Sequence, residues 1–481
     1  MNIWNLVKDI DNLKVIGKDR DIKKLCYSTN DIEDDSLFFC IEGLTVDGHT
    51  FIKKAIEKGA KAIVVSKEVS VDDDITIIRV NDTREAMSLI SSNFYGNPSR
   101  GMDLIGITGT NGKTTSTFMM KAILEASDIK TSLLGTIYNI IGNNKEEAKR
   151  TTPESKDLQY LFKKMVDDNA RACIMEVSSH SLDLKRVCGV AFKVGIFTNL
   201  TQDHLDYHNN MDSYFEAKMK LFEASEYAVI NIDDDYGKIA SKRISDKILT
   251  YGLTKEADLY ATNIIISSEG ASFRIHYNNE SADILLHLPG KFNIYNALGC
   301  IGAGLILNIS LNDIKKGLEN LMAVPGRSEK VSSKKGYTII IDYAHTPDGL
   351  ENILSSTKEY TKGRLIALFG CGGDRDKTKR PLMGKAAGDI ADFCIVSSDN
   401  PRTEDPSKII EDIIPGVKNS DCPYVIIEDR KAAIKYAIDN AKKDDIIVIA
   451  GKGHETYQVL KDKTIHFDEK EIVIEFLKED L

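Results

Sequence analysis

The sequence predicts an α/β protein built from three domains, and two observations support that fold class. Short apolar runs alternate with helix-like stretches along nearly the whole chain, which is typical of sheets joined by crossover helices. At 481 residues the chain is too long for one hydrophobic core, so about two to four domains are expected. Two breaks rich in turn-forming residues, Tyr95–Pro98 and Val324–Arg327, predict domains over residues 1–99, 100–324 and 325–481.

Each predicted domain has its own set of strands. In the first, a helix over Phe51–Lys58 accompanies strands at Leu37–Ile41, Ala62–Val65 and Ile75–Val80. In the second, a parallel sheet is expected from strands at Leu104–Ile107, Cys173–Val177, Val194–Phe197 and Ala228–Ile232. The third predicts a Rossmann-like sheet from strands at Tyr337–Asp342, Leu365–Phe369, Phe393–Val396, Tyr424–Ile427 and Ile446–Ala450.

Composition and charge exclude several classes of protein. Apolar residues make up 42% of the chain and charged residues 28%, as in ordinary globular proteins. The formal net charge of −10 argues against a nucleic-acid partner. No apolar stretch is long enough to cross a bilayer and no signal peptide is apparent, so a cytoplasmic protein without membrane insertion is expected. The eight cysteines form no Cys-x-x-Cys pair, which predicts buried thiols rather than disulfides or a zinc site.

Residues 106–115 form the most informative motif, Gly-Ile-Thr-Gly-Thr-Asn-Gly-Lys-Thr-Thr. It lies between a predicted strand and a predicted helix at Ser116–Ala126, the arrangement of a phosphate-binding loop. Lys113 would reach the outer phosphates and the Thr114 hydroxyl would hold Mg²⁺. The glycine spacing is one residue longer than usual, so Gly109 is expected to supply the flexible point. The second domain is therefore predicted to be of the P-loop ATPase type.

Polar side chains follow two further strands of this domain. Glu176 ends one strand, where nucleoside triphosphatases commonly place a second metal contact. The next strand is followed by residues 199–206, which include His204. A histidine is a less usual ligand for Mg²⁺, which prefers oxygen, and His204 and His208 could instead cap their loop.

Six motifs in chain order carry a family resemblance: Gly109–Thr115, Thr151–Glu154, Glu176–His180, Thr201–His208, Asp342–Pro347 and Asp399–Arg402. Together they resemble the Mur ligases of peptidoglycan synthesis, over nearly the whole chain. The resemblance is greatest to the members that add meso-2,6-diaminopimelate to UDP-N-acetylmuramoyl-L-alanyl-D-glutamate. It implies an N-terminal UDP-sugar-binding domain, a central ATP-binding domain and a C-terminal amino-acid-binding domain.

The resemblance also implies a reaction. ATP phosphorylates a carboxylate, an amine attacks the acyl phosphate, and phosphate leaves as the amide forms. The catalytic residues implied are Lys113, Glu176, His204 and Lys218. Thr114 and Glu176 would hold one Mg²⁺, His204 would help with a second, and Lys218 would carry a carbamate (N6-carboxylysine) that orients metal and acyl phosphate. Without the family, Lys218 reads as a helix-surface lysine.

Binding residues carry over by matching position. The resemblance assigns ATP to Gly109, Thr110, Asn111, Gly112, Lys113, Thr114, Thr115, Asn293, Asn296, Arg327 and Asp342. It assigns the UDP-substrate to Tyr27, Thr29, Thr151, Thr152, Ser178 and Arg186. It assigns diaminopimelate to Arg375, Asp399, Asn400, Pro401, Arg402, Gly451 and Glu455. Because these residues come from separate domains, catalysis is expected to require domain closure.

The chain departs from the family pattern at two places. Residues 28–30 read Ser-Thr-Asn where relatives usually have Asp-Ser-Arg, and Leu184 replaces a glutamine. Thr29 keeps a hydroxyl, so uridine-side binding is expected to persist. Asn30 lacks the cation, which leaves the contact to the diphosphate open.

The choice of amino acid is expected to depend on Arg402. Diaminopimelate has a distal carboxylate that lysine lacks, and an arginine can bind it through two parallel hydrogen bonds. Arg375 would take a substrate carboxylate and Glu455 the distal ammonium. The alternative interpretation of residues 374–380 is a solvated charged loop.

Three rival functions remain open from the sequence. A lysine-adding ligase would share every motif except the arginine one. Folylpolyglutamate synthase shares the phosphate loop but lacks a domain like residues 1–99. A nucleotide-binding protein without catalysis need not retain Lys113, Glu176, His204 and Lys218 together. The expected partners are the UDP-N-acetylmuramoyl dipeptide and diaminopimelate, and a monomer is expected.

Overall fold

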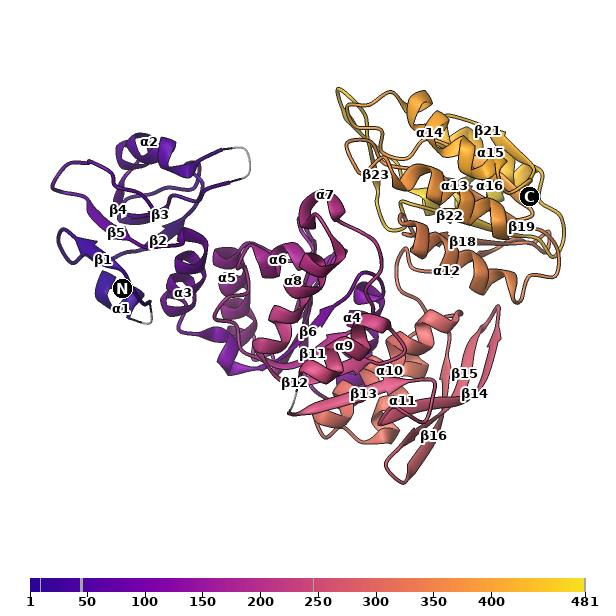
Figure 1. The fold of residues 1–481 in the computed structure, drawn as a ribbon, viewed down its shortest axis with the longest axis horizontal. Helices are drawn as coiled ribbons and strands as arrows, with labels where there is room; N and C mark the ends of the chain where they lie inside the picture. The colour runs from indigo at the N-terminus through magenta and orange to yellow at the C-terminus, as the bar shows by residue number, and fades with distance from the viewer. Residues whose placement is uncertain (9, 44–45, 245, 480–481) are drawn as a thin grey trace. The chain divides into compact units, whose positions relative to one another are not determined.

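The computed structural model describes residues 1–481 except 9, 44–45, 245 and 480–481 (Figure 1). The chain forms two compact units. The first contains Met1–Thr108, Asp128–Ile196 and Glu216–Ala228, and the second contains Gly109–Ser127, Phe197–Phe215 and Val229–Leu481. The boundaries at 99/100 and 324/325 remain a prediction.

The N-terminal region of the first unit is a five-stranded sheet with helices on both faces. Its elements are α1 (Ile3–Val7), β1 (Lys14–Ile16), β2 (Lys24–Cys26), β3 (Ser36–Phe39), η1 (Gly48–Phe51), α2 (Ile52–Glu57), β4 (Ala60–Val65), β5 (Thr76–Arg79), α3 (Thr83–Phe94) and η2 (Pro98–Gly101). The strand order is β1-β5-β4-β3-β2, with only β1 antiparallel to its neighbour. Alternate residues of β3 and β4 face opposite cores: Phe39 and Val64 pack with α1 and α3, whereas Phe38 and Ile63 pack with α2.

The central sheet has eleven strands in the order β16-β15-β14-β13-β12-β11-β6-β10-β7-β8-β9. Its first elements are β6 (Asp103–Thr108), α4 (Lys113–Ala126), β7 (Thr131–Leu134), β8 (Tyr138–Ile141), β9 (Asn144–Glu147), α5 (Ser155–Asp167), β10 (Ala172–Glu176), α6 (Ser179–Asp183), β11 (Phe192–Phe197) and α7 (Leu205–His208). They are followed by α8 (Met211–Glu223), β12 (Ser225–Asn231), α9 (Asp235–Arg243), β13 (Ile248–Gly252), β14 (Leu259–Ser267), β15 (Gly270–Tyr277), β16 (Glu280–Leu286), α10 (Lys291–Ile306) and α11 (Leu311–Asn320).

The central sheet is parallel in its middle, as expected, and antiparallel at its two edges. Strand β10 pairs in parallel with β6 and β7, but β7, β8 and β9 pair antiparallel, as do β14, β15 and β16. Strands β14 and β15, next to the edge strand β16, alternate between buried and more exposed residues, because one face of an antiparallel sheet can meet water. Continuous apolar runs, which predict fully buried strands, do not detect them.

The C-terminal region of the second unit is a six-stranded sheet ordered β17-β18-β22-β19-β20-β21, plus a β23-β24 hairpin. Its elements are β17 (Glu329–Ser332), β18 (Thr338–Asp342), α12 (Pro347–Lys358), β19 (Leu365–Phe369), α13 (Lys379–Ile390), β20 (Phe393–Val396), α14 (Pro406–Lys418), β21 (Tyr424–Ile426), α15 (Arg430–Asp439), β22 (Ile446–Ala450), β23 (Tyr457–Val459), β24 (Thr464–His466) and α16 (Glu469–Glu479).

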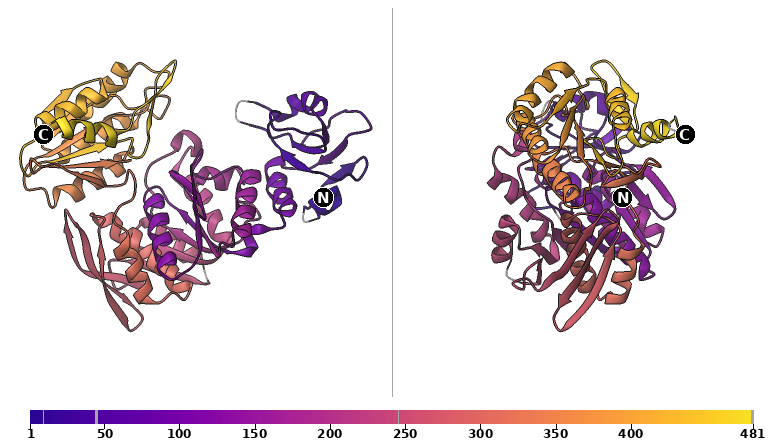
Figure 2. Two further views of the ribbon diagram at one scale, coloured as in Figure 1. Left: turned by 180° about the vertical axis from the view of Figure 1, so that it is seen from behind. Right: turned by 90° about the vertical axis from the view of Figure 1, so that its right-hand side faces the viewer.

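This sheet is covered on both faces, as a Rossmann-like arrangement requires (Figures 1 and 2). Helices α12, α13 and α14 pack on one core and α15 and α16 on the other. Only β17 is antiparallel to its neighbour. The carboxyl ends of β19 and β20 therefore lie at the same edge, which is where parallel sheets place their ligands.

The predicted strands all occur, with ends displaced by a few residues, and α4 begins at Lys113 instead of Ser116. All eight cysteines are free and seven are buried, so the prediction of buried thiols is confirmed with Cys188 as the half-buried exception. Within the described ranges, no helix is both long and apolar enough to cross a membrane.

Candidate active site

The phosphate-binding loop begins at the end of β6 and ends on the first turn of α4. Gly112 caps α4 in a left-handed conformation with φ of +85°. A Cβ at this position would lie 2.2 Å from Oδ1 of Asn296, so only glycine fits. Asn296 in turn donates to Asn293, and both lie on α10. Of the two asparagines expected on the adenine side, Asn296 is thus packed against the loop itself, and Asn293 is bonded to Asn296 and to the carbonyl of Pro289.

The chain after β11 holds this loop in shape. Asn199 accepts from the backbone N–H of Asn111 at 2.9 Å, and the Thr198 hydroxyl donates to the carbonyl of Asn111 at 2.7 Å. The Thr110 hydroxyl accepts from the backbone N–H of Thr201 at 3.0 Å. No role was predicted for Asn199, although its position just after a predicted buried strand is typical of a site residue.

Lys113 folds back over the loop that precedes it. Its Nζ donates to the carbonyls of Gly109 and Thr110, both at 2.8 Å. The ammonium group is therefore held at the loop, where backbone N–H groups and the helix N-terminus favour phosphate oxygens.

Arg327 connects the predicted hinge to the predicted magnesium ligand. Its Nη2 donates to Oγ1 of Thr114 at 3.1 Å, and its guanidinium lies 4.6 Å from the ring centroid of Tyr343. Its buried Nε has no hydrogen-bond partner among the described residues. Asp342 is buried close by, where burial raises its pKa, and it accepts from the backbone N–H groups of Ser328 and Ala344. In this conformation the Asp342 carboxylate is thus occupied by hydrogen bonds from backbone N–H groups.

Asp348, at the start of α12, binds two parts of the nucleotide loop region. Its Oδ2 accepts from Nδ2 of Asn111 at 2.6 Å and from the Thr201 hydroxyl at 3.2 Å. Burial raises the pKa of this carboxyl. Asp348 could not be predicted from the sequence, because nothing in its local pattern indicates a partner so distant in the chain.

In the first unit, Glu176 is buried at the end of β10, with 1% of its surface exposed. Its two carboxylate oxygens accept from the backbone N–H of Thr136 at 2.7 Å and from the Thr136 hydroxyl at 3.0 Å. The same hydroxyl lies 3.1 Å from Oγ1 of Thr151. Thr136, which sequence reasoning missed, therefore fixes Glu176 beside a residue predicted to bind the UDP-substrate.

Four of the residues predicted to bind the UDP-substrate lie together. The Thr152 hydroxyl donates to the carbonyl of Glu176 at 2.9 Å and accepts from the backbone N–H of Ser178 at 3.2 Å. Arg186 donates to the carbonyl of Thr152 at 3.2 Å. With Thr151 they form a group around the end of β10. Tyr27 is bonded instead to Asp157 on α5, at 2.6 Å.

Glu154 gathers three arginines next to this group. Its carboxylate lies 2.8 Å from Arg186, 2.9 Å from Arg150 and 3.8 Å from Arg84 on α3. Burial lowers the pKa of Arg186, although Glu154 opposes that effect. Cations are therefore present near the predicted substrate residues even though Asn30 replaces an arginine. Sequence reasoning singled out only Arg186 of the three.

Lys218 and His204 differ sharply in exposure. Lys218 lies on α8 with 1% of its surface exposed, so its interpretation as a helix-surface lysine is wrong. The His204 side chain is 45% exposed and lies 3.4 Å from the Asp203 carboxylate. The backbone of His204 has φ of +54°. His208 is buried and stacked on Tyr214. Lys218 belongs to the first unit and His204 to the second.

The residues predicted to bind the amino acid gather at the carboxyl edge of the C-terminal sheet. Asn400 donates to the Glu455 carboxylate at 2.8 Å and accepts from Lys452 at 3.1 Å. Lys452 is fully buried and also contacts Glu455 at 2.9 Å. Asp399 accepts from the backbone N–H of Asn400 at 2.6 Å. A buried cation thus neutralises the carboxylate that was expected to meet a substrate ammonium group.

The two predicted arginines lie on adjacent loops of this edge. Arg402 donates to the carbonyl of Gly373 at 2.8 Å, while Arg375 is exposed and donates to the carbonyl of its neighbour Asp374. Gly451 follows β22, and the Cβ that it lacks would lie 2.4 Å from the Asp399 carboxylate. Pro401 lies between Asn400 and Arg402 and packs its carbonyl against Gly373.

Three family profiles match the chain along its length. Residues 21–95 match "Mur ligase family, catalytic domain", residues 107–304 match "Mur ligase middle domain", and residues 326–453 match "Mur ligase, glutamate ligase domain". The chain is also 53% identical, over 485 residues covering 100% of both chains, to the UDP-N-acetylmuramoyl-L-alanyl-D-glutamate–2,6-diaminopimelate ligase of Clostridium botulinum. The chain belongs to the Mur ligase family. The protein of the same name from Caldanaerobacter subterraneus is 47% identical to this chain, and the match covers 100% of this chain and 99% of the relative.

Solved structures of Mur ligases share the fold of this chain. A structure titled as a UDP-N-acetylmuramoyl-L-alanyl-D-glutamate–2,6-diaminopimelate ligase matches it with a TM-score of 0.69, at 30% identity and with 96% of each chain covered. The MurF ligase of Thermotoga maritima in complex with ADP matches with a TM-score of 0.64 at 17% identity, with 95% and 97% covered. This second likeness concerns the fold alone.

The donor chemistry of this Mur ligase suits Mg²⁺. Thr114 offers a hydroxyl and Glu176 a carboxylate, and both are the oxygen ligands that this ion prefers. Among the residues that the structure describes, no three His, Cys, Asp or Glu side chains converge as a metal cage. Mg²⁺ typically takes one or two carboxylates together with substrate phosphates and waters, so such a cage is not required.

Replacing Asp348 with alanine is expected to raise the KM for ATP by about tenfold, because Asn111 of the nucleotide loop and Thr201 beside it each lose a hydrogen bond to a charged acceptor. Steady-state kinetics with varied ATP measures this change. Glu351→Ala, on an exposed position of the same helix, is the matched control and should leave the KM within about twofold. An unchanged KM for ATP in Asp348→Ala would contradict a role for this carboxylate in holding the loop.

Proposed function

We propose that this chain is an ATP-dependent ligase that joins meso-2,6-diaminopimelate to UDP-N-acetylmuramoyl-L-alanyl-D-glutamate in peptidoglycan synthesis. The observation that carries the proposal is the cluster at the carboxyl edge of the C-terminal sheet, where Arg375 and Arg402 offer two guanidinium groups. A diamino diacid presents two carboxylates that complement them, whereas the Glu455 carboxylate is already paired with Lys452. Full-length relatives named for this reaction support the same assignment.

The chemistry proceeds in two steps. A carboxylate oxygen of the dipeptide attacks the γ-phosphorus of ATP, forming a new P–O bond while the bond to the β-phosphate oxygen breaks and ADP leaves. The amine nitrogen of diaminopimelate then attacks the acyl carbon. The C–N bond forms, the C–O bond to phosphate breaks, and inorganic phosphate and a proton are released.

The roles of the loop residues follow from the charge that develops in phosphoryl transfer. Lys113 and the loop N–H groups stabilise the phosphate oxygens, and Arg327 extends this positive surface to Thr114. Thr114 and Glu176 would hold Mg²⁺, which neutralises the phosphates when bound, and His204 would assist a second ion. Asn293 and Asn296 would lie on the adenine side.

We further propose that Lys218 reacts with carbon dioxide to form N6-carboxylysine. Its burial supports this assignment, because an ammonium group removed from water is costly and the neutral amine is the form that attacks carbon dioxide. The resulting carbamate is an anion able to orient cations and the acyl phosphate.

The UDP-substrate would be bound by Thr151, Thr152, Ser178 and Arg186, with Tyr27 and Thr29 on the uridine side. The arginines around Glu154 support an anion-binding role for this region. Asn30 lacks the positive charge of the arginine usual in relatives. Arg84, which comes from the same N-terminal region, could supply a positive charge in its place. A cytoplasmic, monomeric enzyme remains part of the proposal.

Arg402→Ala is expected to raise the KM for meso-diaminopimelate by about ten- to hundredfold, because a hydrogen-bonded ion pair with the distal carboxylate is lost. Residual turnover with L-lysine should change little. Arg402→Lys keeps the charge without the planar fork and should recover only part of the loss. Kinetics with each amino acid measures the effect, and an equal loss with both would contradict the assignment of Arg402.

Each rival function predicts a different substrate requirement or product. A lysine-adding ligase would prefer L-lysine over meso-diaminopimelate. A folylpolyglutamate synthase-like enzyme would use a folate and glutamate, and the N-terminal domain of this chain disfavours it. A nucleotide-binding protein without catalysis would release no ADP.

The deciding experiment is ADP release by the purified protein with ATP and Mg²⁺. Release should require both the UDP-dipeptide and meso-diaminopimelate. Omission of either co-substrate should return the rate to background. Release that is independent of the amino acid would contradict the proposed ligase.

A further inference from the structure

Two loops that carry the predicted arginines are joined backbone to backbone. Residues 372–375 follow β19 and residues 399–402 follow the adjacent strand β20. The N–H of Gly373 donates to the carbonyl of Asn400 at 2.9 Å. A Cβ on Gly373 would lie 2.0 Å from the carbonyl oxygen of Pro401, so no larger residue allows this approach.

Both loops include a residue in an unfavourable conformation. Asp374 has φ of +53° and Arg402 has φ of +52°, a region that residues other than glycine seldom adopt. Such conformations persist when the surroundings hold them, and they cluster at functional sites. Asp374 accepts from the Thr403 hydroxyl at 2.7 Å, and Arg402 donates to the carbonyl of Gly373. Each loop thus holds the strained residue of the other.

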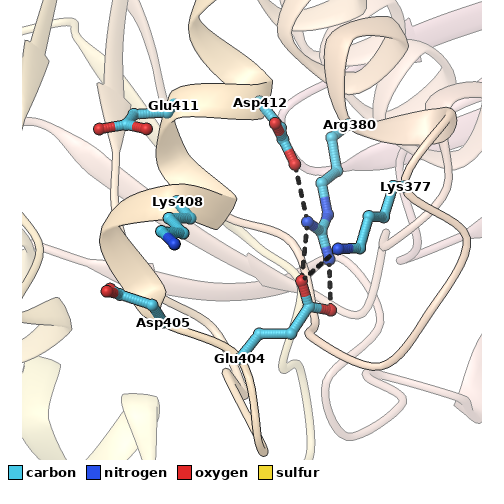
Figure 3. A pocket seen from close by; sticks show the side chains of 7 residues that line it. All are labelled: Lys377, Arg380, Glu404, Asp405, Lys408, Glu411 and Asp412. Carbon is cyan, nitrogen blue, oxygen red and sulfur yellow. Dashed lines mark hydrogen bonds and ion pairs between the residues drawn. The ribbon is translucent and has the colours of Figure 1, made fainter.

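Glu404 is a further side chain that connects the first loop to the second. It lies just beyond Arg402, and its Oε1 accepts from the backbone N–H of Asp374 at 2.6 Å. The carboxylate also binds both terminal nitrogens of Arg380, at 2.8 and 3.1 Å, and lies 3.2 Å from Nζ of Lys377 (Figure 3). One carboxylate therefore connects the start of α13 to both loops.

Arg380 makes this connection rigid. Its side chain is 1% exposed, and it lies between Glu404 and Asp412 of α14, whose carboxylate is 2.8 Å away (Figure 3). The paired hydrogen bonds from Arg380 lower the pKa of Glu404 to about 2, so the carboxylate is ionised throughout the neutral range. A buried, doubly paired arginine is a fixed anchor for the acid that contacts the loop.

Glu404 also borders two hollows of the surface. One, of about 420 Å³, is lined by Arg375 as well. The other, of about 410 Å³, includes Arg380 and Asp412 in its wall (Figure 3). Glu404 therefore connects the buried Arg380 to the side of the loops on which Arg375 is exposed.

We propose that Glu404 is a positioning residue for selection of the incoming amino acid. Anchored by Arg380, it fixes the loop of Arg375 relative to the loop of Arg402, so that the two guanidinium groups meet both carboxylates of a diamino diacid in one geometry. This inference rests on the proposed function. The simpler alternative is an ion-pair cluster that only stabilises the domain.

Asp412 provides the matched control between these two roles. It binds the same arginine at the same 2.8 Å as Glu404 Oε1, but it lies on α14, and among the described residues no hydrogen bond or ion pair joins it to either loop. Asp412→Asn therefore removes one charge from beside Arg380 but leaves the bonds of Glu404 to Arg380 and to Asp374 in place. Thr403→Val is a second test variant, because it removes a hydrogen bond between the loops at an exposed position away from Arg380.

The experiment measures kcat and the three KM values, together with the melting temperature, for the full-length unaltered protein and the variants Glu404→Ala, Glu404→Gln, Thr403→Val and Asp412→Asn. Glu404→Ala should raise the KM for meso-diaminopimelate about tenfold, and leave those for ATP and the UDP-dipeptide within about twofold. Glu404→Gln keeps an acceptor for the Asp374 N–H and should show a smaller rise, as should Thr403→Val. Asp412→Asn should stay within about twofold for all three substrates.

Three results would overturn the inference alone: an unchanged KM for diaminopimelate in the Glu404 and Thr403 variants, an equal rise for all three substrates, or the same selective rise in Asp412→Asn. If Glu404→Ala does not fold, Glu404→Gln and Thr403→Val decide the question by the same criteria. An unaltered protein that does not use diaminopimelate would overturn the proposed function, and the inference with it.

Discussion

Replacing Lys113 with alanine is expected to reduce the rate of ligation by at least about a thousandfold. The ammonium group is held at the carbonyls of Gly109 and Thr110, within the loop whose N–H groups favour phosphate oxygens. Its charge is needed most when the phosphoryl group is in transfer, so kcat should fall more than the affinity for ATP. Product formation in single-turnover experiments measures the loss.

A matched control lies on the same helix. Lys121 pairs with Glu125 one turn further along α4, away from the loop, so Lys121→Ala should retain activity within about twofold. Activity of Lys113→Ala close to that of the unaltered protein would contradict the assignment of residues 109–115 as the site of phosphoryl transfer.

Lys218→Ala is expected to lose nearly all ligation activity and to recover part of it when a short carboxylic acid, such as formate or acetate, is added. The added acid would occupy the space of the proposed carbamate and supply its negative charge. A lysine needed only for packing would not be restored in this way. Turnover as a function of added acid measures the recovery.

Lys220 is the control for this variant. It is two residues along α8 and pairs with Asp183 at the surface, so Lys220→Ala should behave like the unaltered protein with and without added acid. Normal turnover of Lys218→Ala, or a loss that no acid restores, would contradict the carbamate.

Much of the fold was predictable because buried parallel strands leave continuous apolar runs. The strands over Leu365–Phe369, Phe393–Val396 and Ile446–Ala450 were predicted with their observed bounds. The antiparallel edges were missed, because strands such as Leu259–Ser267 alternate between buried and exposed residues and contain polar side chains. Helix α4 was placed late because its first turn, Lys-Thr-Thr, is polar, although Thr114 and Thr115 are buried.

Site residues can be predicted from the sequence where a local motif indicates the chemistry. The loop at residues 109–115 and the arginine at position 402 are examples, and their roles stay predictions. Lys218 shows the limit: its helix was expected to leave it exposed, and only tertiary packing buries it. Asp348 and Glu404 were missed for a related reason, since their partners Asn111 and Arg380 are fixed by the folded chain and not by spacing.

The central claim is that the enzyme uses ATP to join a diamino diacid to the UDP-dipeptide. The most direct test is incubation of the purified protein with ATP, Mg²⁺, the UDP-dipeptide and an equimolar mixture of meso-diaminopimelate and L-lysine, followed by mass measurement of the product. The account predicts a product lengthened almost entirely by diaminopimelate, with one ADP formed for each amide bond. A product lengthened mainly by lysine, or no lengthened product at all, would contradict it.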